Sequence, residues 1–198
     1  ELAREEIEDF PEVSEVEVVR HFTRLSTWNY GVDSGFYPLG SCTMKYNPKI
    51  NETAARKPGL ALIHPYTPAS LSQGAMEIIY RLEKMLAEIS GFPAITLHPA
   101  AGAHGELAGM MVIRAFHEKQ GNPRRKVLIP DTAHGTNPAS AALCGYKSVP
   151  LETGTDGVLT PEAVEALMDE DTAGLMDTNP NTLGLFETHT RQIADIVH

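Results

Sequence analysis

The sequence predicts an α/β protein with a largely parallel sheet, and three observations support this class. From Ala94 onward, short apolar runs typical of strands alternate with segments of helical periodicity. Three of the predicted strands are each followed by a loop rich in small and polar residues. Apolar residues make up 42% and charged residues 21% of the 198 residues, which suits a globular chain with one good-sized core. Strands that alternate with helices are usually joined by right-handed crossovers and therefore lie parallel.

A capped helix is predicted near the beginning of the sequence. Residues 1–9 are typical of the end of one helix, and Ser14 is the predicted N-cap of the next. Glu17 is placed to complete a capping box with Ser14, and the helix then runs to about Leu25. We expect its apolar face to be buried; this face consists of Val18, Val19, Phe22 and Leu25.

Residues 26–75 differ from the rest of the chain because Gly, Pro and aromatic residues are frequent there. A long irregular segment with many aromatic side chains is more typical of an ordered functional surface than of disorder. We interpret it as an arm that lies across a partner subunit or a site, which residues 41–45 approach. The predicted organisation is therefore an N-terminal region of helices and extended arm, 1–71, followed by the first part of a larger domain, 72–198.

The region from residue 72 onward contains the alternating elements that define the class. The predicted helices cover residues 72–90, about 105–119, 139–143, 160–168 and 186–198. The predicted strands cover residues 94–97, 126–130, 146–151 and 172–176.

Charge and cysteine content exclude several classes of function. The net charge of −10 argues against general affinity for nucleic acid or anionic membranes, and no apolar run is long enough to span a bilayer. Cys42 and Cys144 have no CxxC spacing, which favours two free thiols in a reducing compartment over a redox disulfide. The eight histidines show no metal-ligand spacing, so no metal site is predicted.

Three loops should meet at the carboxyl edge of the predicted sheet, where ligands bind in such folds. We refer to residues 98–105 as the first loop, 131–138 as the second loop and 177–184 as the third loop. The first loop opens a helix, so the amides of Gly102, Ala103 and His104 are available to an anion such as a phosphate monoester. The alternative is tight strand–helix packing without a ligand. A Walker lysine is absent, which disfavours a nucleoside triphosphate with magnesium.

The second and third loops carry groups suited to a planar ligand. His134 in the second loop can stack on a ring or act as an acid or base near neutral pH, or its ring can be satisfied by backbone hydrogen bonds. The amides and hydroxyls of residues 178–182 in the third loop can bond a ring substituent, or they can serve turn formation alone. Taken together, the three loops describe a flat phosphorylated cofactor, and pyridoxal phosphate fits that description.

Long segments that include these loops closely resemble one known family. The sequence is similar to the glycine cleavage system P-proteins, which are pyridoxal-phosphate-dependent glycine dehydrogenases (decarboxylating), in their subunit 2 form. The resemblance extends from about Ser14 through nearly the whole chain. The matching segments are PLGSCTMKYNPKINE (38–52), HPYTPASLSQGAMEIIYRLEKMLAEISGF (64–92), HPAAGAHGELAGM (98–110), DTAHGTNPASAALCGY (131–146) and TNPNTLGLFE (178–187).

The resemblance implies a type I aminotransferase-like fold, of which this chain holds only part, with residues 72–198 beginning the cofactor-binding large domain. It implies that the amides of Gly102, Ala103 and His104 hold the cofactor phosphate. His134 would stack against the pyridine ring and assist proton movement, and Thr178 or Asn181 would lie near the phenolic oxygen. The sequence departs from the family at Asp177, where we expect an apolar residue.

The resemblance also implies an activity and a set of partners. The activity is decarboxylation of glycine with transfer of the aminomethyl group to the lipoyl arm of H-protein. The partners are subunit 1 of the P-protein and H-protein, in a heterotetramer or larger assembly in the cytoplasm of a bacterium or archaeon. In the family, the Schiff-base lysine follows an Asp-Gly-Ala-Asn type segment downstream of the third loop, and no such segment occurs here. We therefore expect the chain to be part of a longer enzyme and inactive alone.

Two other functions stay open at this stage. The first is another type I pyridoxal-phosphate enzyme, such as a desulfurase or an aminotransferase, which the GSCTMKYNP segment disfavours. The second is a non-catalytic assembly subunit. The lack of a matching lysine motif favours it, but a missing stretch of chain explains that lack more simply.

Overall fold

The computed structural model describes residues 9–37 and 45–198. The chain divides into two compact units, Glu1–His64 and Pro65–His198. Three features named above lie mostly or wholly outside the described residues. They are the predicted helix end at residues 1–9, the predicted contact at residues 41–45, and Cys42. The predicted division after residue 71 stays a prediction.

The first unit begins with the capped helix that the sequence predicts. Helix α1 spans Glu15–Ser26, and its N-cap is Ser14. The amide of Glu17 donates to Ser14 Oγ at 3.3 Å, and the amide of Ser14 donates to Glu17 Oε2 at 3.0 Å. This reciprocal pair satisfies two helix-end donors, so the capping-box prediction is confirmed.

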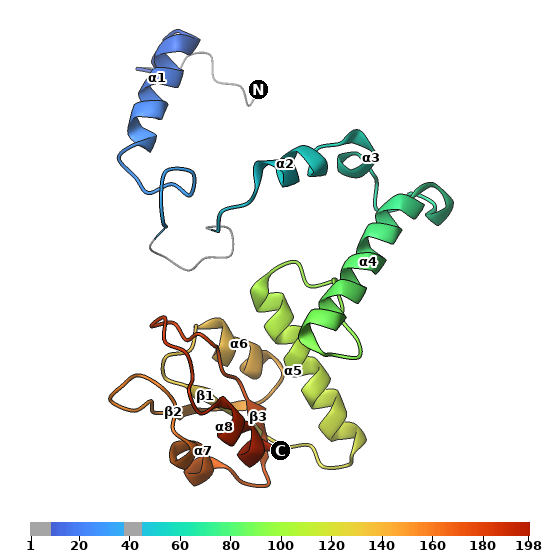
Figure 1. Cartoon of the computed structure of the whole chain (residues 1–198), viewed down its shortest axis with the longest axis vertical. Helices are drawn as coiled ribbons and strands as arrows, with labels where there is room; N and C mark the ends of the chain where they lie inside the picture. Colours follow the sequence, from blue (N-terminus) through green and yellow to red (C-terminus); the bar gives the residue numbers. More distant parts are fainter. Residues whose placement is uncertain (1–8, 38–44) are drawn as a thin grey trace, which may run out of the picture. The chain divides into compact units, whose positions relative to one another are not determined.

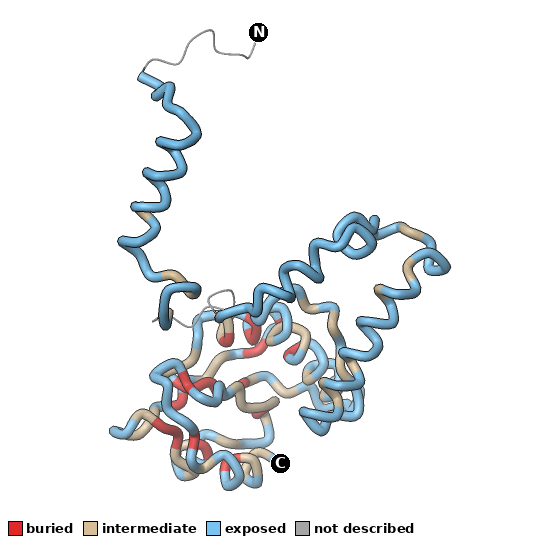
Figure 2. The backbone as a smooth tube through the Cα atoms, turned by 45° about the horizontal axis from the view of Figure 1, so that its top comes forward, coloured by how far each residue is buried: buried red, intermediate tan, exposed pale blue. Residues whose placement is uncertain are grey.

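The predicted burial of the apolar face of α1 is wrong within this chain. Phe22 is 62% exposed and Val19 is 55% exposed, and α1 contains no buried residue. Figure 2 shows α1 as exposed along nearly its whole length. The amphipathic pattern forms the helix, but among the described residues of this unit no element packs on its apolar face.

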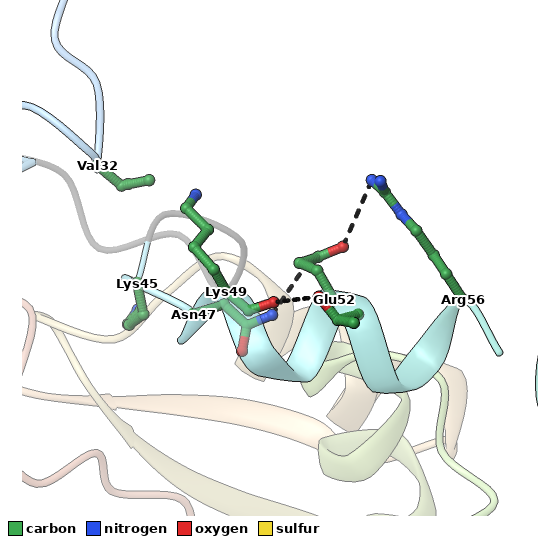
Figure 3. Close-up of a pocket in the computed structure, with 7 residues that line it drawn as sticks. Val32, Lys45, Asn47, Lys49, Glu52 and Arg56 are labelled. Atoms are coloured by element: carbon green, nitrogen blue, oxygen red, sulfur yellow. Dashed lines mark hydrogen bonds and ion pairs between the residues drawn. The ribbon is translucent and has the colours of Figure 1, made fainter.

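The arm contains short helices rather than continuous irregular chain. Helix α2 spans Lys49–Ala55 and α3 spans Pro58–Ala61. Lys49 Nζ lies 2.7 Å from Asp33 Oδ1 and ties α2 to the preceding turn. Figure 3 shows the neighbouring contact of Asn47 with Glu52, whose Nδ2–Oε1 distance is 3.0 Å. These contacts are exposed, and such pairs contribute little to stability.

The second unit begins with a 3-10 turn and a long helix. The 3-10 turn, η2, spans Ala69–Leu71, and α4 spans Gln73–Ser90. Gly91 ends α4 with a φ of +73°, a left-handed conformation that glycine adopts without strain. The apolar side chains of α4 are largely exposed (Figure 2). In the described part of the chain, no helix is long and apolar enough to cross a membrane.

The core of the second unit is a three-stranded sheet in the order β2-β1-β3 among the described residues (Figure 1). Its strands are parallel, as predicted. Strand β1 spans Lys126–Pro130, β2 spans Lys147–Leu151 and β3 spans Thr172–Leu175. Leu128 pairs with Val149 on one side and with Leu175 on the other. The central position of β1 explains its continuous apolar sequence, because neighbours cover both of its faces and both of its edges.

Two helical layers cover the sheet, one on each face. Helices α5 (Gly102–Lys119) and α6 (Thr136–Leu143) pack on the face that carries Val127. Helices α7 (Pro161–Leu167) and α8 (Thr190–Val197) pack on the opposite face, which carries Leu128. Val127 and Leu128 are both fully buried, and burial of such a side chain stabilises the fold by about 1.5–3 kcal/mol.

The predicted strand at residues 94–97 is absent, which corrects the sequence prediction. Residues 92–99 have no regular secondary structure, although Ile95 and Leu97 are half-buried. This segment instead lies beside α4, with which it lines a cavity of about 190 Å³ near Ile79 and Glu83. An apolar alternation favours a strand only when a neighbouring strand supplies hydrogen bonds, and no described strand pairs with this segment.

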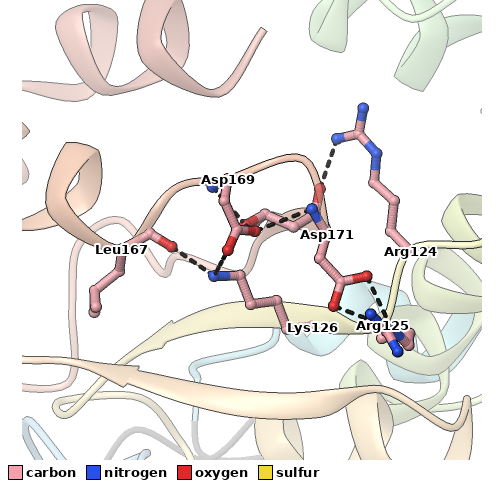
Figure 4. Close-up of polar contacts among 7 residues, drawn as sticks. Arg124, Arg125, Lys126, Leu167, Asp169 and Asp171 are labelled. Carbon is pink, nitrogen blue, oxygen red and sulfur yellow. Dashed lines mark hydrogen bonds and ion pairs between the residues drawn. The ribbon is translucent and has the colours of Figure 1, made fainter.

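Charged side chains hold the starts of β1 and β3 together at the amino edge of the sheet (Figure 4). Arg125 Nε donates to both carboxylate oxygens of Asp171 at 3.1 Å. Lys126 Nζ donates to Asp169 Oδ2 and to the carbonyl of Leu167, each at 2.8 Å. The hydrogen bond from Lys126 lowers the pKa of Asp169 below its usual range, with further help from the amide of Asp171.

Asp169→Asn should therefore destabilise the full-length gene product in a pH-dependent way. A carboxyl whose folded pKa is depressed contributes stability above its unfolded pKa of about 3.9, and this contribution disappears as the pH falls through the folded pKa. We expect a lower melting temperature than wild type at neutral pH, with the difference shrinking at acidic pH. Glu170→Gln, which changes an exposed carboxylate in the same turn, is the control. A difference that stays constant with pH would contradict the assigned role.

Candidate functional site

The second and third loops lie together at the carboxyl edge of the sheet. They follow β1 and β3, which are neighbouring parallel strands. The amide of Met176 donates to the carbonyl of Leu128 at 3.0 Å and continues the ladder toward this edge. Beyond the strands, Thr182 Oγ1 donates to the carbonyl of Thr132 and so joins the two loops directly.

The start of α5 points toward the same edge. Near the C-terminus of α5, His117 Nε2 lies 3.0 Å from the carbonyl of Ala173 at the beginning of β3. Toward its N-terminus, Leu107 packs on the cluster that contains Ile129, near the end of β1. The helix therefore runs antiparallel to the strands, and the first loop ends at the edge where the other two loops lie.

Two of the three predicted phosphate-binding amides are free. The N-cap of α5 is Ala101, and no side chain caps the helix. The amide of His104 donates to the carbonyl of Ala101 at 3.1 Å, whereas the amides of Gly102 and Ala103 make no hydrogen bond with the described residues. Free amides at the positive end of an 18-residue helix without an acidic first turn fit a phosphate group.

Glu106, in the second turn of α5, carries a buried acceptor. Among the described residues, Glu106 Oε2 is buried and has no hydrogen-bond partner. A Cβ added at Gly105 would meet no atom within 4 Å, so the surface around this turn of α5 is open. The first turns of α5 thus combine open space, two free donors and one unsatisfied acceptor.

His134 is exposed at the edge, and one of its ring nitrogens is engaged. The amide of Thr136 donates to His134 Nδ1 at 3.2 Å, and Thr136 Oγ1 lies 2.9 Å from the same atom. Because Nδ1 accepts the backbone donor, the neutral ring carries its proton on Nε2. The backbone bond orients the imidazole while its Nε2 makes no hydrogen bond with the described residues. The two interpretations of this histidine, backbone-bonded and chemically available, are therefore compatible.

Asn181 serves the turn of the third loop. It is 6% exposed, and its Oδ1 accepts from the amides of Leu183 at 3.0 Å and Leu185 at 3.1 Å. Its Nδ2 donates to the carbonyl of Gly157 at 2.8 Å. Thr178, the other candidate near a ring substituent, is exposed. Of the two, the Thr178 hydroxyl is the one that remains accessible to a ligand.

Glu187 holds the third loop in place, a role that sequence reasoning did not find. It is 6% exposed, and its Oε2 accepts from the amide of Leu159 at 2.8 Å. Its Oε1 accepts from Asn181 Nδ2 at 3.3 Å. The sequence signal for this role is weak, because Glu187 is an acidic residue that follows the apolar stretch LGLF (183–186). That pattern indicates neither that the carboxylate is buried nor which groups it bonds.

Asp177 stands at the end of β3, where the sequence departs from the family pattern. Its Oδ1 accepts from the amide of Thr178 at 2.8 Å. Desolvation by the surrounding protein raises the pKa of this carboxyl above its usual range, and the negative charge of Glu187 adds to the effect. The carboxylate therefore shapes the backbone at Thr178 and resists ionisation more than an ordinary surface aspartate.

The described lysines of the sheet region lie away from this edge. Lys126 and Lys147 begin β1 and β2, and Lys119 ends α5, so all three belong to the amino edge. Lys84 lies in α4. None of these four follows the carboxyl end of a strand, where the three loops meet.

Comparison with solved structures defines the class of fold. The chain matches glycine decarboxylase (P-protein) of the glycine cleavage system, in inhibitor-bound form, with a TM-score of 0.67 and 24% identity over 95% of this chain and 41% of that one. It also matches Oryza sativa TDC with PLP and tryptamine, with a TM-score of 0.58 and 17% identity over 98% and 47% of the two chains. The fold is thus that of the type I, pyridoxal-phosphate-dependent enzymes, as predicted.

Sequence comparison identifies a particular relative. The chain is 60% identical over 191 residues to a probable glycine dehydrogenase (decarboxylating) subunit 2 of Alkaliphilus oremlandii, covering 96% of this chain and 39% of the relative. It is 57% identical over 199 residues to the protein of the same name from Halalkalibacterium halodurans, covering 100% of this chain and 41% of the relative. No protein-family model matches the sequence. The predicted resemblance to subunit 2 is confirmed, and the chain spans about two fifths of the length of these relatives.

Glu187→Gln should loosen the third loop. The substitution removes the charge and turns one acceptor oxygen into a donor that faces either the Leu159 amide or Asn181 Nδ2. Leaving such a buried donor unsatisfied costs about 1–3 kcal/mol. Urea unfolding of the full-length gene product measures the loss, with the exposed Glu152→Gln as the matched control, expected within about 0.5 kcal/mol of wild type. Equal stability of the two variants would refute the role of Glu187.

Proposed function

We propose that this chain supplies part of the pyridoxal phosphate site of a glycine dehydrogenase (decarboxylating). Such an enzyme removes carbon dioxide from glycine and passes the aminomethyl group to the lipoyl arm of H-protein in the glycine cleavage system. The observation that carries the proposal is the 60% identity, over 96% of this chain, to a protein named as subunit 2 of that enzyme. The grouping of the three loops at one edge of the sheet supports it.

The residues present fit the cofactor. The free amides of Gly102 and Ala103 would hold its phosphate at the start of α5, where the helix dipole favours negative charge. The exposed hydroxyl of Thr178 would bond a ring substituent, and Asn181 would support the loop that carries it. When bound, the cofactor supplies an electron sink for the carbanion left by decarboxylation.

His134 has two roles in this proposal. Its imidazole would stack on the cofactor ring, because the residue is exposed and the Thr136 amide fixes the ring through Nδ1. Its Nε2, which carries the proton in the neutral form, would hold or release that proton. An imidazole is suited to this task because its ring nitrogens can both donate and accept a proton.

The proposed assembly follows from the same relationship. A chain named subunit 2 implies a subunit 1, and we propose a heterotetramer or larger complex of the two. The substrate is glycine, and the lipoyl arm of H-protein is the acceptor. We place this complex in the cytoplasm, as for a metabolic enzyme of the bacteria that hold the relatives.

A non-catalytic assembly role is the second candidate. The position of the described sheet-region lysines favours it, since none of them lies at the carboxyl edge. Other type I pyridoxal-phosphate enzymes share the fold, and their sequence identity of 17% or less to this chain carries no argument for their activities.

Replacement of His134 tests the site in the full-length enzyme with its partner subunit. We expect His134→Ala to weaken cofactor affinity about 2- to 10-fold, because stacking contributes about 0.5–1.5 kcal/mol. Decarboxylation should fall further, by about 10²- to 10⁴-fold, through loss of proton transfer. His134→Phe should restore cofactor affinity without restoring activity, and His21→Ala on exposed α1 is the control. Wild-type affinity and activity in His134→Ala would remove this residue from the site.

Borohydride reduction separates the catalytic proposal from the assembly role. A lysine bonded to the cofactor becomes permanently labelled, and mass mapping of the full-length gene product locates the label. We expect one labelled lysine, distinct from Lys119, Lys126 and Lys147, which belong to the amino edge. Absence of any label would favour the assembly role, and a label on one of these three lysines would contradict the proposed site.

A further inference from the structure

A cavity with several charged residues in its lining lies at the amino edge of the sheet, the edge opposite the three loops. Its volume is about 220 Å³, and it opens between the last turns of α5 and the residues that precede β1 and β2. Three arginines line it: Arg114, Arg124 and Arg125. In a chain with a net charge of −10, a cavity with three arginines and one glutamate, Glu118, in its lining is a local reversal of charge.

Two of these arginines are paired with carboxylates. Arg114 Nε lies 2.8 Å from Glu118 Oε1, and its Nη1 donates to the carbonyl of Cys144. Gly145, with a φ of +76°, makes room for this contact, because a Cβ there would lie 2.8 Å from Arg114 Nη1. Arg125 Nε donates to Asp171, as described above.

Arg124 differs from the other two. Its Nη1 donates to the carbonyl of Thr172 at 2.6 Å, which fixes the guanidinium over the start of β3 (Figure 4). Its Nε is buried and has no acceptor, and no carboxylate pairs with it among the described residues. Because Nε has no accessible surface, a ligand in the cavity would bond the other terminal nitrogen, Nη2, which makes no hydrogen bond with the described residues.

We propose that this cavity binds a small oxyanion, a free carboxylate or phosphate group, with Arg124 as its principal contact. Three guanidinium charges against Glu118 and Asp171 leave one positive charge, which a singly charged anion neutralises. Arg114 and Arg125 also line the cavity, and each keeps donors that its ion pair does not use. Arginine suits this task because its planar fork bonds two oxygens of one carboxylate or phosphate.

The size of the cavity limits the ligand. Water occupies about 30 Å³ per molecule, so the cavity holds several waters and more than a bare ion. It is smaller than the sites of about 300–1,000 Å³ that bind drug-sized molecules. The ligand is therefore a small acid or inorganic phosphate. This site does not rest on the proposed function, since it lies at the other edge of the sheet from the candidate cofactor site.

Calorimetric titration with inorganic phosphate tests the site. The protein is the full-length gene product with its partner subunit, saturated with pyridoxal phosphate so that the amides of α5 are occupied. We expect phosphate to bind the wild type and to bind Arg124→Gln at least 10-fold more weakly, with affinity falling as salt rises. Arg81→Gln, which removes an exposed arginine paired with Glu77 on α4, should bind as wild type does. A parallel titration with acetate extends the test to carboxylates.

A second variant at Arg124 distinguishes loss of binding from loss of folding. Arg124→Lys keeps a positive charge and a donor for the Thr172 carbonyl but loses the fork, so we expect a native melting temperature and intermediate affinity. Saturating phosphate should raise the melting temperature of wild type and Arg81→Gln, and leave that of Arg124→Gln unchanged. No binding of phosphate or acetate to the wild type, or equal affinity in wild type and Arg124→Gln, would overturn the proposal.

Discussion

The burial of strand β1 on both faces is the constraint on which the second unit depends. Val127 and Leu128 point to opposite faces, and both are fully buried. A strand of this kind needs a helical layer on each face and a strand on each edge. Helices α5 and α6 cover one face, α7 and α8 cover the other, and β2 and β3 pair with the two edges. Because β1 and β3 are parallel neighbours, the sheet itself brings the loops that follow them to the same edge.

The two edges of the sheet are built from different chemistry. At the amino edge, arginine and lysine side chains bridge to Asp169 and Asp171 and fix where β1 and β3 begin. At the carboxyl edge, neutral hydrogen bonds and one buried carboxylate, Glu187, hold the third loop. The carboxyl edge therefore presents free amides, a hydroxyl and an imidazole, which suit recognition of a phosphorylated ring.

The sequence predicted the regular elements well because their signals are local. The capping box at Ser14, the Gly91 helix end and the alternating strands and helices from Lys126 onward depend on residues close to one another in the chain. The failures involve partners that the sequence does not show. Residues 94–97 lack a neighbouring strand, and the apolar face of α1 lacks a covering element among the described residues.

The candidate site was predicted to the level of loops, and less well for individual groups. Asn181 was a candidate ligand group, and the structure commits its amide to Gly157, Leu183 and Leu185. His104 was a candidate phosphate donor, and its amide bonds Ala101. In both cases a residue type suited to ligand binding also suits local backbone bonding, and only three-dimensional geometry distinguishes the two uses.

The hydrogen bond from the Thr182 hydroxyl to the Thr132 carbonyl connects the third loop to the second. This contact lies two residues from His134 in the second loop and four residues from Thr178 in the third. A ligand that displaces the third loop would therefore also bear on the backbone that carries the imidazole.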